Sequence, residues 1–264
     1  MSVSQRQPFI LLFVIMILIV HMPALIKAQE DDTENTVQVQ FNGHVFLLPT
    51  SLADGFSAFL IDQPTPYPDG SDTLQPPRTE FRLQMHSDTV NTQPAVGWIN
   101  VYDVDDLEDH AAYDQYERLR DLLTERPDLN AEAILPTLYP YQRSALSPDL
   151  YTEFFVNAAY IESADYRGIT FIYGRVIHAN NRQPILFYRV YFEGISSDGQ
   201  RYLSAQIEGL PGLITSLDGV TDPDDYLAQA QALFHNPTDD AVIAWFQQAE
   251  LMFASFDYTP PPQP

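Results

Sequence analysis

Four segments with the composition of β-strands follow one another in the second half of the chain, and they constrain the fold most strongly. β-Branched and aromatic residues dominate these segments, and short turns such as residues 196–199 (SSDG) separate them. Strands joined by short turns pair antiparallel with their chain neighbours. The sequence therefore predicts an antiparallel meander sheet, built from residues 153–161, 169–177, 185–195 and 201–207.

Both faces of the predicted meander are apolar. Along residues 185–195, Phe187 and Tyr191 fall on one face, while Leu186 and Val190 fall on the other. A sheet with one solvated face alternates more cleanly, so we expect helices on both sides. Three segments with helical periodicity are candidates for that cover: residues 109–126, 222–234 and 238–256. The predicted fold class is α+β, an antiparallel meander sheet covered by helices on both faces, which makes an α/β/α sandwich.

The N-terminal segment, residues 1–28, has the layout of a secretory signal peptide. Arg6 stands in a short polar start, residues 9–20 are apolar without interruption, and residues 26–28 (IKA) offer a small-residue cleavage site. The apolar run is shorter than the roughly 20 residues that span a bilayer. The alternative is an uncleaved N-terminal anchor. Either interpretation predicts that the rest of the chain is secreted or lies on the outer face of the cell membrane.

Composition divides the remaining chain into three parts. Residues 29–36 are acidic and polar, which is typical of a disordered spacer. Residues 37–258 have the length and the apolar content of a single α+β domain. Residues 259–264 form a proline-rich tail.

Residue usage excludes several kinds of chemistry. The chain has no cysteine, and Lys27, inside the leader, is its only lysine. The exported part therefore has no disulfide, thiolate metal site, Schiff-base lysine or phosphate-loop lysine. The formal net charge of −23 argues against nucleic acid and anionic lipid as partners. We expect no cofactor, because no nucleotide-binding or metalloprotease motif occurs.

Several strings resemble a group of exported bacterial proteins and lipoproteins of unknown function that have one α+β domain. They are residues 45–49 (VFLLP), 99–104 (INVYDV), 188–194 (YRVYFEG) and 198–204 (DGQRYLS). The end of the last helix, residues 253–256 (FASF), is similar to that of PsbP/Mog1-like domains. That second resemblance implies an antiparallel sheet between helices. Neither group supplies a catalytic motif, and the lipoprotein cysteine is missing here.

A cluster of acidic residues lies between a predicted strand and a predicted helix, and clustered carboxylates are the ligands that Ca²⁺ prefers. Its members are Asp103, Asp105, Asp106, Glu108 and Asp109. The spacing lacks the glycine and the final glutamate of a calcium loop. The alternative interpretation is a solvated helix start, in which acids favour the positive end of the helix dipole and Asp109 is the cap.

Two tyrosines and two arginines fall on one face of the predicted meander, where they suit a carboxylate or sugar ligand. They are Tyr173, Arg175, Arg189 and Tyr191. The alternative is that the arginines pair across strands with Glu193 or Glu208 under a helix.

The absence of strong catalytic motifs favours an exported, non-enzymatic accessory or binding domain for an unknown ligand or envelope protein. Two alternatives remain open at this stage. One is a cofactor-free hydrolase that works outside the cytoplasm through carboxylates. The other is an interaction module tethered to the membrane by the N-terminal segment.

Overall fold

A computed structural model of the chain describes residues 35–66, 74–84, 95–131, 134, 150–178, 183–209, 214, 216–237 and 239–260. Its first strands are β1 (Thr36–Phe41), β2 (His44–Pro49), β3 (Gly55–Ile61), β4 (Thr65–Pro66), β5 (Leu74–Gln75), β6 (Arg78–Gln84) and β7 (Ala95–Asp103). Its later strands are β8 (Tyr151–Glu162), β9 (Tyr166–Ile177), β10 (Ile185–Ser196), β11 (Arg201–Glu208) and β12 (Asp257–Tyr258). Its helices are the short 3₁₀ turn η1 (Val104–Asp106), α2 (Ala111–Glu125), α4 (Pro223–His235) and α5 (Asp240–Ala254).

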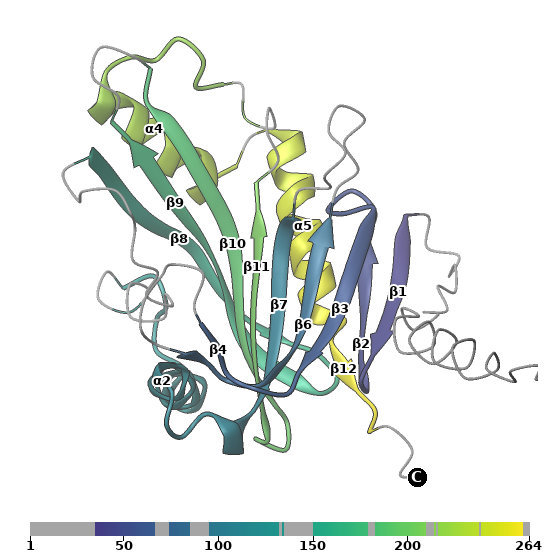
Figure 1. Cartoon of the computed structure of the whole chain (residues 1–264). Helices are drawn as coiled ribbons and strands as arrows, with labels where there is room; N and C mark the ends of the chain where they lie inside the picture. The colour runs from purple at the N-terminus through teal and green to yellow at the C-terminus, as the bar shows by residue number, and fades with distance from the viewer. Residues whose placement is uncertain are drawn as a thin grey trace, which may run out of the picture.

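Seven strands form one antiparallel sheet in the order β3-β6-β7-β11-β10-β9-β8 (Figure 1). Strands β8 to β11 pair in chain order, as the sequence predicts. On the β11 side, β7 continues the sheet, and β6 and β3 follow it. Strands from both halves of the chain therefore build one continuous surface.

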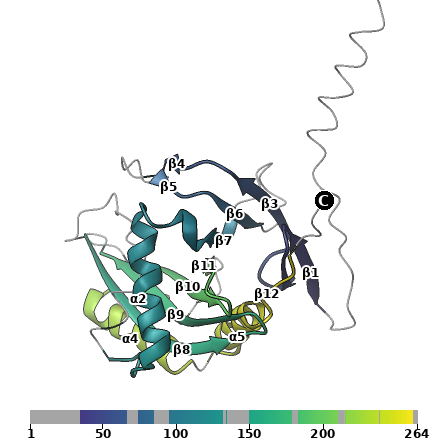
Figure 2. The same ribbon diagram turned by 90° about the horizontal axis from the view of Figure 1, so that it is seen from below.

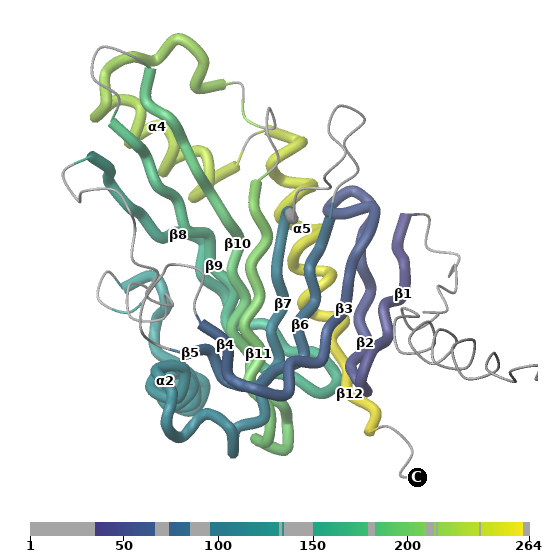
Figure 3. Tube along the Cα trace, in the orientation of Figure 1, coloured from purple at the N-terminus to yellow at the C-terminus, as the bar shows by residue number. Residues whose placement is uncertain are grey.

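A second, three-stranded sheet in the order β1-β2-β12 lies beside the large one. Its hairpin packs on β6, because the ring of Phe46 meets the ring of Phe81 edge-on at 5.2 Å. On its other side Phe46 stacks on Phe256, with ring centroids 4.7 Å apart. β12 pairs with β2, so the C-terminal strand lies against the first hairpin (Figure 3).

The predicted α/β/α sandwich is wrong. The described structure is 46% strand and 26% helix, with three α-helices in the part of the chain that is described. On one face α2 packs on β9 and β10, and α4 and α5 lie on the opposite face (Figure 2). At β6, the β1–β2 hairpin and not a helix covers the face of the large sheet on which α5 lies. The helix cover is also incomplete at the start of β10, where Ile185 and Phe187 are 50% and 55% exposed.

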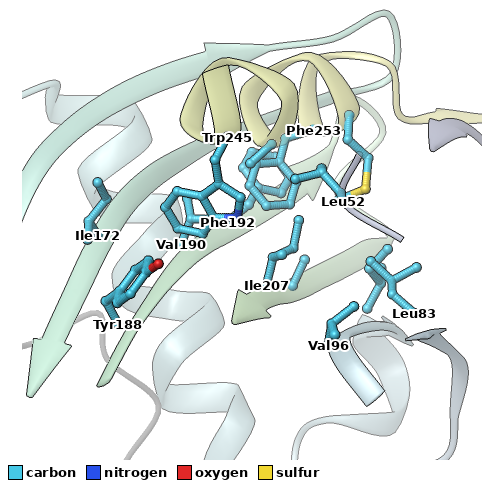
Figure 4. Packing of buried hydrophobic residues seen from close by; sticks show 14 of the residues in the cluster. Leu52, Leu83, Val96, Ile172, Tyr188, Val190, Phe192, Ile207, Trp245 and Phe253 are labelled. Atoms are coloured by element: carbon cyan, nitrogen blue, oxygen red, sulfur yellow. The ribbon is translucent and has the colours of Figure 1, made fainter. Parts of the chain in front are cut away.

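The main hydrophobic core lies between the large sheet and α5. Figure 4 shows Trp245 and Phe253 of α5 directed at the strands. Phe253 stacks on Phe192 at 5.0 Å, and Trp245 meets Tyr188 edge-on at 5.3 Å. Burying each large side chain contributes about 1.5–3 kcal/mol, so this helix is fixed firmly to the sheet.

Local signals set the helix starts. Asp222 caps α4 by accepting hydrogen bonds from the backbone N–H groups of Asp224 and Asp225, and Pro223 takes the first helical position. Asp239 caps α5 in the same way. The prediction that Asp109 caps α2 is wrong, because His110 occupies the cap position and makes no side-chain cap bond.

The predicted leader, residues 1–28, and most of the predicted spacer lie outside the described residues. Among the residues that are described, no helix has both the length and the apolarity to cross a membrane.

Candidate functional site

A cavity of about 260 Å³ opens at the end of the large sheet where β3 and β7 finish and β6 and β11 begin. The turn between β1 and β2 and the strand β12 close its other side. It is lined by Asn42, His44, Leu60, Ile61, Asp62, Pro77, Arg78, Thr79, Val101, Asp103, Asp106, Arg201 and Tyr258. We call it the sheet-end pocket.

The tight turn of the first hairpin builds one wall of the sheet-end pocket. Asn42 and Gly43 have φ angles of 49° and 82°, the left-handed pair that a type I′ turn requires. The Asn42 side chain then donates a hydrogen bond of 2.9 Å from Nδ2 to Oγ1 of Thr79 on β6. This bond ties the small sheet to the large one at the pocket and fixes the position of His44, the first residue of β2.

His44 is an almost fully buried imidazole in this wall, with 4% of its surface exposed. Its ring packs against Tyr258 at 5.0 Å and Phe81 at 6.4 Å, and Nδ1 has no hydrogen-bond partner within the described residues. Burial, with a smaller effect from the positive charge of Arg201, lowers the pKa of His44 to about 4. His44 is therefore neutral at pH 7 and offers the pocket a polar but uncharged group.

Arg201, the first residue of β11, also lines the sheet-end pocket. Its guanidinium lies over the ring of Tyr258, 3.4 Å from the centroid, and donates from Nη1 to Oδ2 of Asp198 at 3.1 Å. Its Nε is 4.0 Å from Oδ1 of Asp103, which faces it across the β7–β11 pair. The side chain is 17% exposed, so the surroundings hold the cation in one place.

Burial raises the pKa of Asp103. The positive charge of Arg201 opposes this rise, and the negative charges of Asp106, Asp105 and Asp198 add to it. The Asp103 side chain is still 70% exposed, so solvent screens these charges.

The second cation of the pocket, Arg78, belongs to a buried network. It makes an ion pair of 2.7 Å with Glu80, and both side chains are only 6% exposed. Glu80 also accepts from Arg82, and Arg78 donates to Oγ1 of Thr65 at 3.0 Å. Glu80 therefore shares one negative charge between Arg78 and Arg82, and it fixes Arg78 at the floor of the pocket.

The five acidic residues predicted as a cation site are spread along the end of β7, η1 and the turn before α2. Asp103 and Asp106 line the sheet-end pocket, whereas Asp105, Glu108 and Asp109 do not. Throughout the described residues, no group of three or more His, Asp or Glu side chains is arranged to hold a metal ion. The structure thus brings two of the five to a shared cavity.

The register places the predicted ligand group, Tyr173, Arg175, Arg189 and Tyr191, on one face of β9 and β10. Arg175 pairs with Glu153 at 2.8 Å, and Arg189 pairs with Glu208 at 2.6 Å. Both cations therefore have a carboxylate partner, and none of the four residues lines the sheet-end pocket. A ligand at this group stays a prediction.

Glu193, the other carboxylate predicted as a partner of the arginines, is buried among hydroxyl groups. It is 2% exposed in the middle of the sheet, and it accepts hydrogen bonds from Tyr202 Oη at 2.5 Å and Ser204 Oγ at 2.9 Å. No ion pair joins it to an arginine in the described part of the chain. Burial raises the pKa of Glu193 to about 8, and the two hydrogen bonds only partly oppose this rise.

The chain matches no protein-family model, and it has no significant match among curated proteins. The function is therefore argued from the geometry of the site.

Sequence reasoning missed His44, Arg201 and Tyr258 as members of one site. Two signals are present, because His44 follows the Asn42-Gly43 turn and Arg201 follows the turn that contains Gly199. Each turn places the start of its strand at a sheet end. That both turns meet at the same end depends on tertiary packing.

Proposed function

We propose that the chain is an exported binding domain that holds a small polar molecule in the sheet-end pocket. The observation that carries the proposal is the lining of this cavity, which combines a fixed guanidinium at Arg201, a neutral imidazole at His44 and the carboxyl groups of Asp62, Asp103 and Asp106. Binding sites orient small ligands with a few polar groups of this kind. The volume of about 260 Å³ lies just below the usual range for drug-sized ligands, which favours a small molecule.

The rigidity of the walls supports a binding role. Strand residues supply most of the lining. The Asn42–Thr79 hydrogen bond joins the two sheets beside it, and the Arg78–Glu80 ion pair within β6 fixes the Arg78 side chain. A preformed site loses little conformational entropy when a ligand enters.

A thermal-shift screen of sugars, amino acids, amines and small carboxylic acids tests this proposal. A ligand present at 100 times its Kd adds about 2.7 kcal/mol of stability, or about 5–10 °C in Tm for a domain of this size. Leu60→Trp narrows the pocket from its exposed rim. Leu251→Trp is the matched control, because Leu251 is also an exposed leucine, on α5, and does not line the pocket.

We expect at least one compound to stabilise the wild type and Leu251→Trp but not Leu60→Trp. Stabilisation of all three proteins to the same degree by every active compound would place binding elsewhere.

Export rests on the N-terminal segment, residues 1–28, and mass spectrometry of native material tests it. Cleavage predicts a mature chain that begins at Gln29, and an anchor predicts an intact chain in the membrane fraction. Recovery of the intact chain from soluble lysate would contradict export.

A further inference from the structure

Charged residues alternate in sign along the end of the large sheet that forms the sheet-end pocket. Asp62 follows β3, Arg78 starts β6, Asp103 ends β7 and Arg201 starts β11. These four strands are neighbours in the order β3-β6-β7-β11. Asp106, on η1, adds a third carboxylate to the same cavity.

The two cations in this row already have carboxylate partners outside it. Arg78 is paired with the buried Glu80, and Arg201 donates to Asp198. Asp62 and Asp106, in contrast, have neither a hydrogen-bond nor an ion-pair partner among the residues that the structure describes. The charge that is left to face a ligand is therefore negative.

The remaining lining neither neutralises that charge nor suits a bare metal ion. His44 is buried and has an unpartnered Nδ1, and its lowered pKa keeps it uncharged at pH 7. The described residues contain no group of three or more carboxylate or imidazole ligands placed for a metal. Leu60 and Pro77 offer apolar surface beside the carboxylates, which suits the carbon atoms of an organic cation.

We propose that the molecule held in the sheet-end pocket is a small organic ammonium compound, bound through Asp62 and Asp106. An ammonium group donates three hydrogen bonds and has the opposite charge to these two carboxylates. The net charge of −23 raises the local concentration of such cations near the protein. This inference rests on the proposed binding function and adds the chemical class of the ligand.

Isothermal titration at pH 7 and fixed ionic strength tests the inference with three four-carbon probes. Butane-1,4-diamine carries positive charge, butane-1,4-diol is neutral, and butanedioate is negative. We expect the purified protein to bind the diamine more tightly than either of the other probes.

Two variants locate the binding. Asp106→Asn removes a carboxylate that lines the pocket, and Asp105→Asn removes its exposed neighbour on η1, which does not line it. We expect Asp106→Asn to raise the Kd for the diamine by at least about threefold. The double variant Asp62→Asn/Asp106→Asn should raise it by about tenfold. Asp105→Asn should change the Kd by less than about twofold, because it alters only the long-range field.

Each other outcome overturns the inference. Equal or tighter binding of the diol or butanedioate would show that the pocket does not select for positive charge, while the proposed binding function would stand. Equal losses from Asp105→Asn and Asp106→Asn would show attraction to the acidic surface only. Failure of all three probes to bind would remove the ammonium class, and the broader screen with Leu60→Trp would still decide the binding function separately.

Discussion

Replacing Glu193 with glutamine tests how a buried carboxyl group links the stability of this fold to pH. Glu193 is 2% exposed on β10, and both of its hydrogen-bond partners, Tyr202 and Ser204, are uncharged hydroxyl groups. Burial penalises the carboxylate more than these bonds stabilise it, so the pKa rises from an ordinary value of 4.5 to about 8.

The magnitude follows from the difference between the two pKa values. In the unfolded chain Glu193 ionises near pH 4.5, whereas in the folded protein it keeps its proton up to about pH 8. The stability from the neutral group is fully present below pH 4.5 and falls as the pH rises through the folded pKa. Between the two pKa values each pH unit lowers the free energy of unfolding by about 1.4 kcal/mol. The loss is therefore about 1 kcal/mol at pH 5 and about 3 kcal/mol at pH 7.

Urea unfolding of the wild type and Glu193→Gln at pH 5 and pH 7 measures this term. Between pH 5 and pH 7 the ionisation of Glu193 should lower the free energy of unfolding of the wild type by about 2 kcal/mol. Glutamine does not ionise, so Glu193→Gln should not show this loss. The contribution of His44 is the same in both proteins and cancels. Glu125→Gln, at the exposed last residue of α2, is the control. Its free energy of unfolding should differ from that of the wild type by the same amount at both pH values. A difference for Glu193→Gln that is the same at both pH values, as for the control, would refute the reasoning.

Three further predictions concern the pocket and the core. Glu80→Gln leaves Arg78 buried without its anion, so urea unfolding should show a loss of about 3–5 kcal/mol, and a loss below about 1 kcal/mol would show that water replaces the anion. Phe192 is 1% exposed, so Phe192→Ala should lower the free energy of unfolding by about 3–5 kcal/mol. Phe187 is 55% exposed, so Phe187→Ala should lower it by less than about 1 kcal/mol. Equal losses would contradict the assignment of the core. A bound diamine favours the ionised form of Asp103, whose pKa burial raises, so titration calorimetry should show a Kd that falls as the pH rises through that pKa. A Kd that does not change between pH 4 and pH 7 would argue against this linkage.

The elements with strong local signals were predictable from sequence. The hairpin around Asn42 and Gly43 forms because only residues that tolerate positive φ fit a type I′ turn. Asp222 followed by Pro223 gives the start of α4 for equally local reasons. At α2 the sequence favoured Asp109, because aspartate is a preferred cap residue, but the helix begins one residue later and His110 takes the cap position.

The layer architecture was less predictable, because apolar composition does not say what covers it. Residues on both faces of β10 suggested helices, but Phe187 is largely exposed at one end of the strand. Over β6, Phe81 is covered by Phe46 from the first hairpin, a contact between segments far apart in the chain. Sheet packing of this kind leaves no periodic signal in either segment alone.

The sheet-end pocket was predictable only in part. Asp103 and Asp106 stand out in the sequence because they are close to other acids, which is a local pattern. His44, Arg201 and Tyr258 are far apart in the sequence and lie in three different strands. The pairing of β12 with β2 brings Tyr258 to His44, and the packing of Arg201 on the Tyr258 ring brings the third side chain to the same cavity.

Nuclear magnetic resonance of the protein titrated with its best stabilising compound tests the central claim most directly. Binding in the sheet-end pocket predicts that the largest amide shift changes fall at Asn42, Thr79 and Arg201. Changes centred on Arg175 and Arg189 would place the ligand on the β9–β10 face instead. That result, or shift changes spread evenly over the surface, would contradict the proposed site.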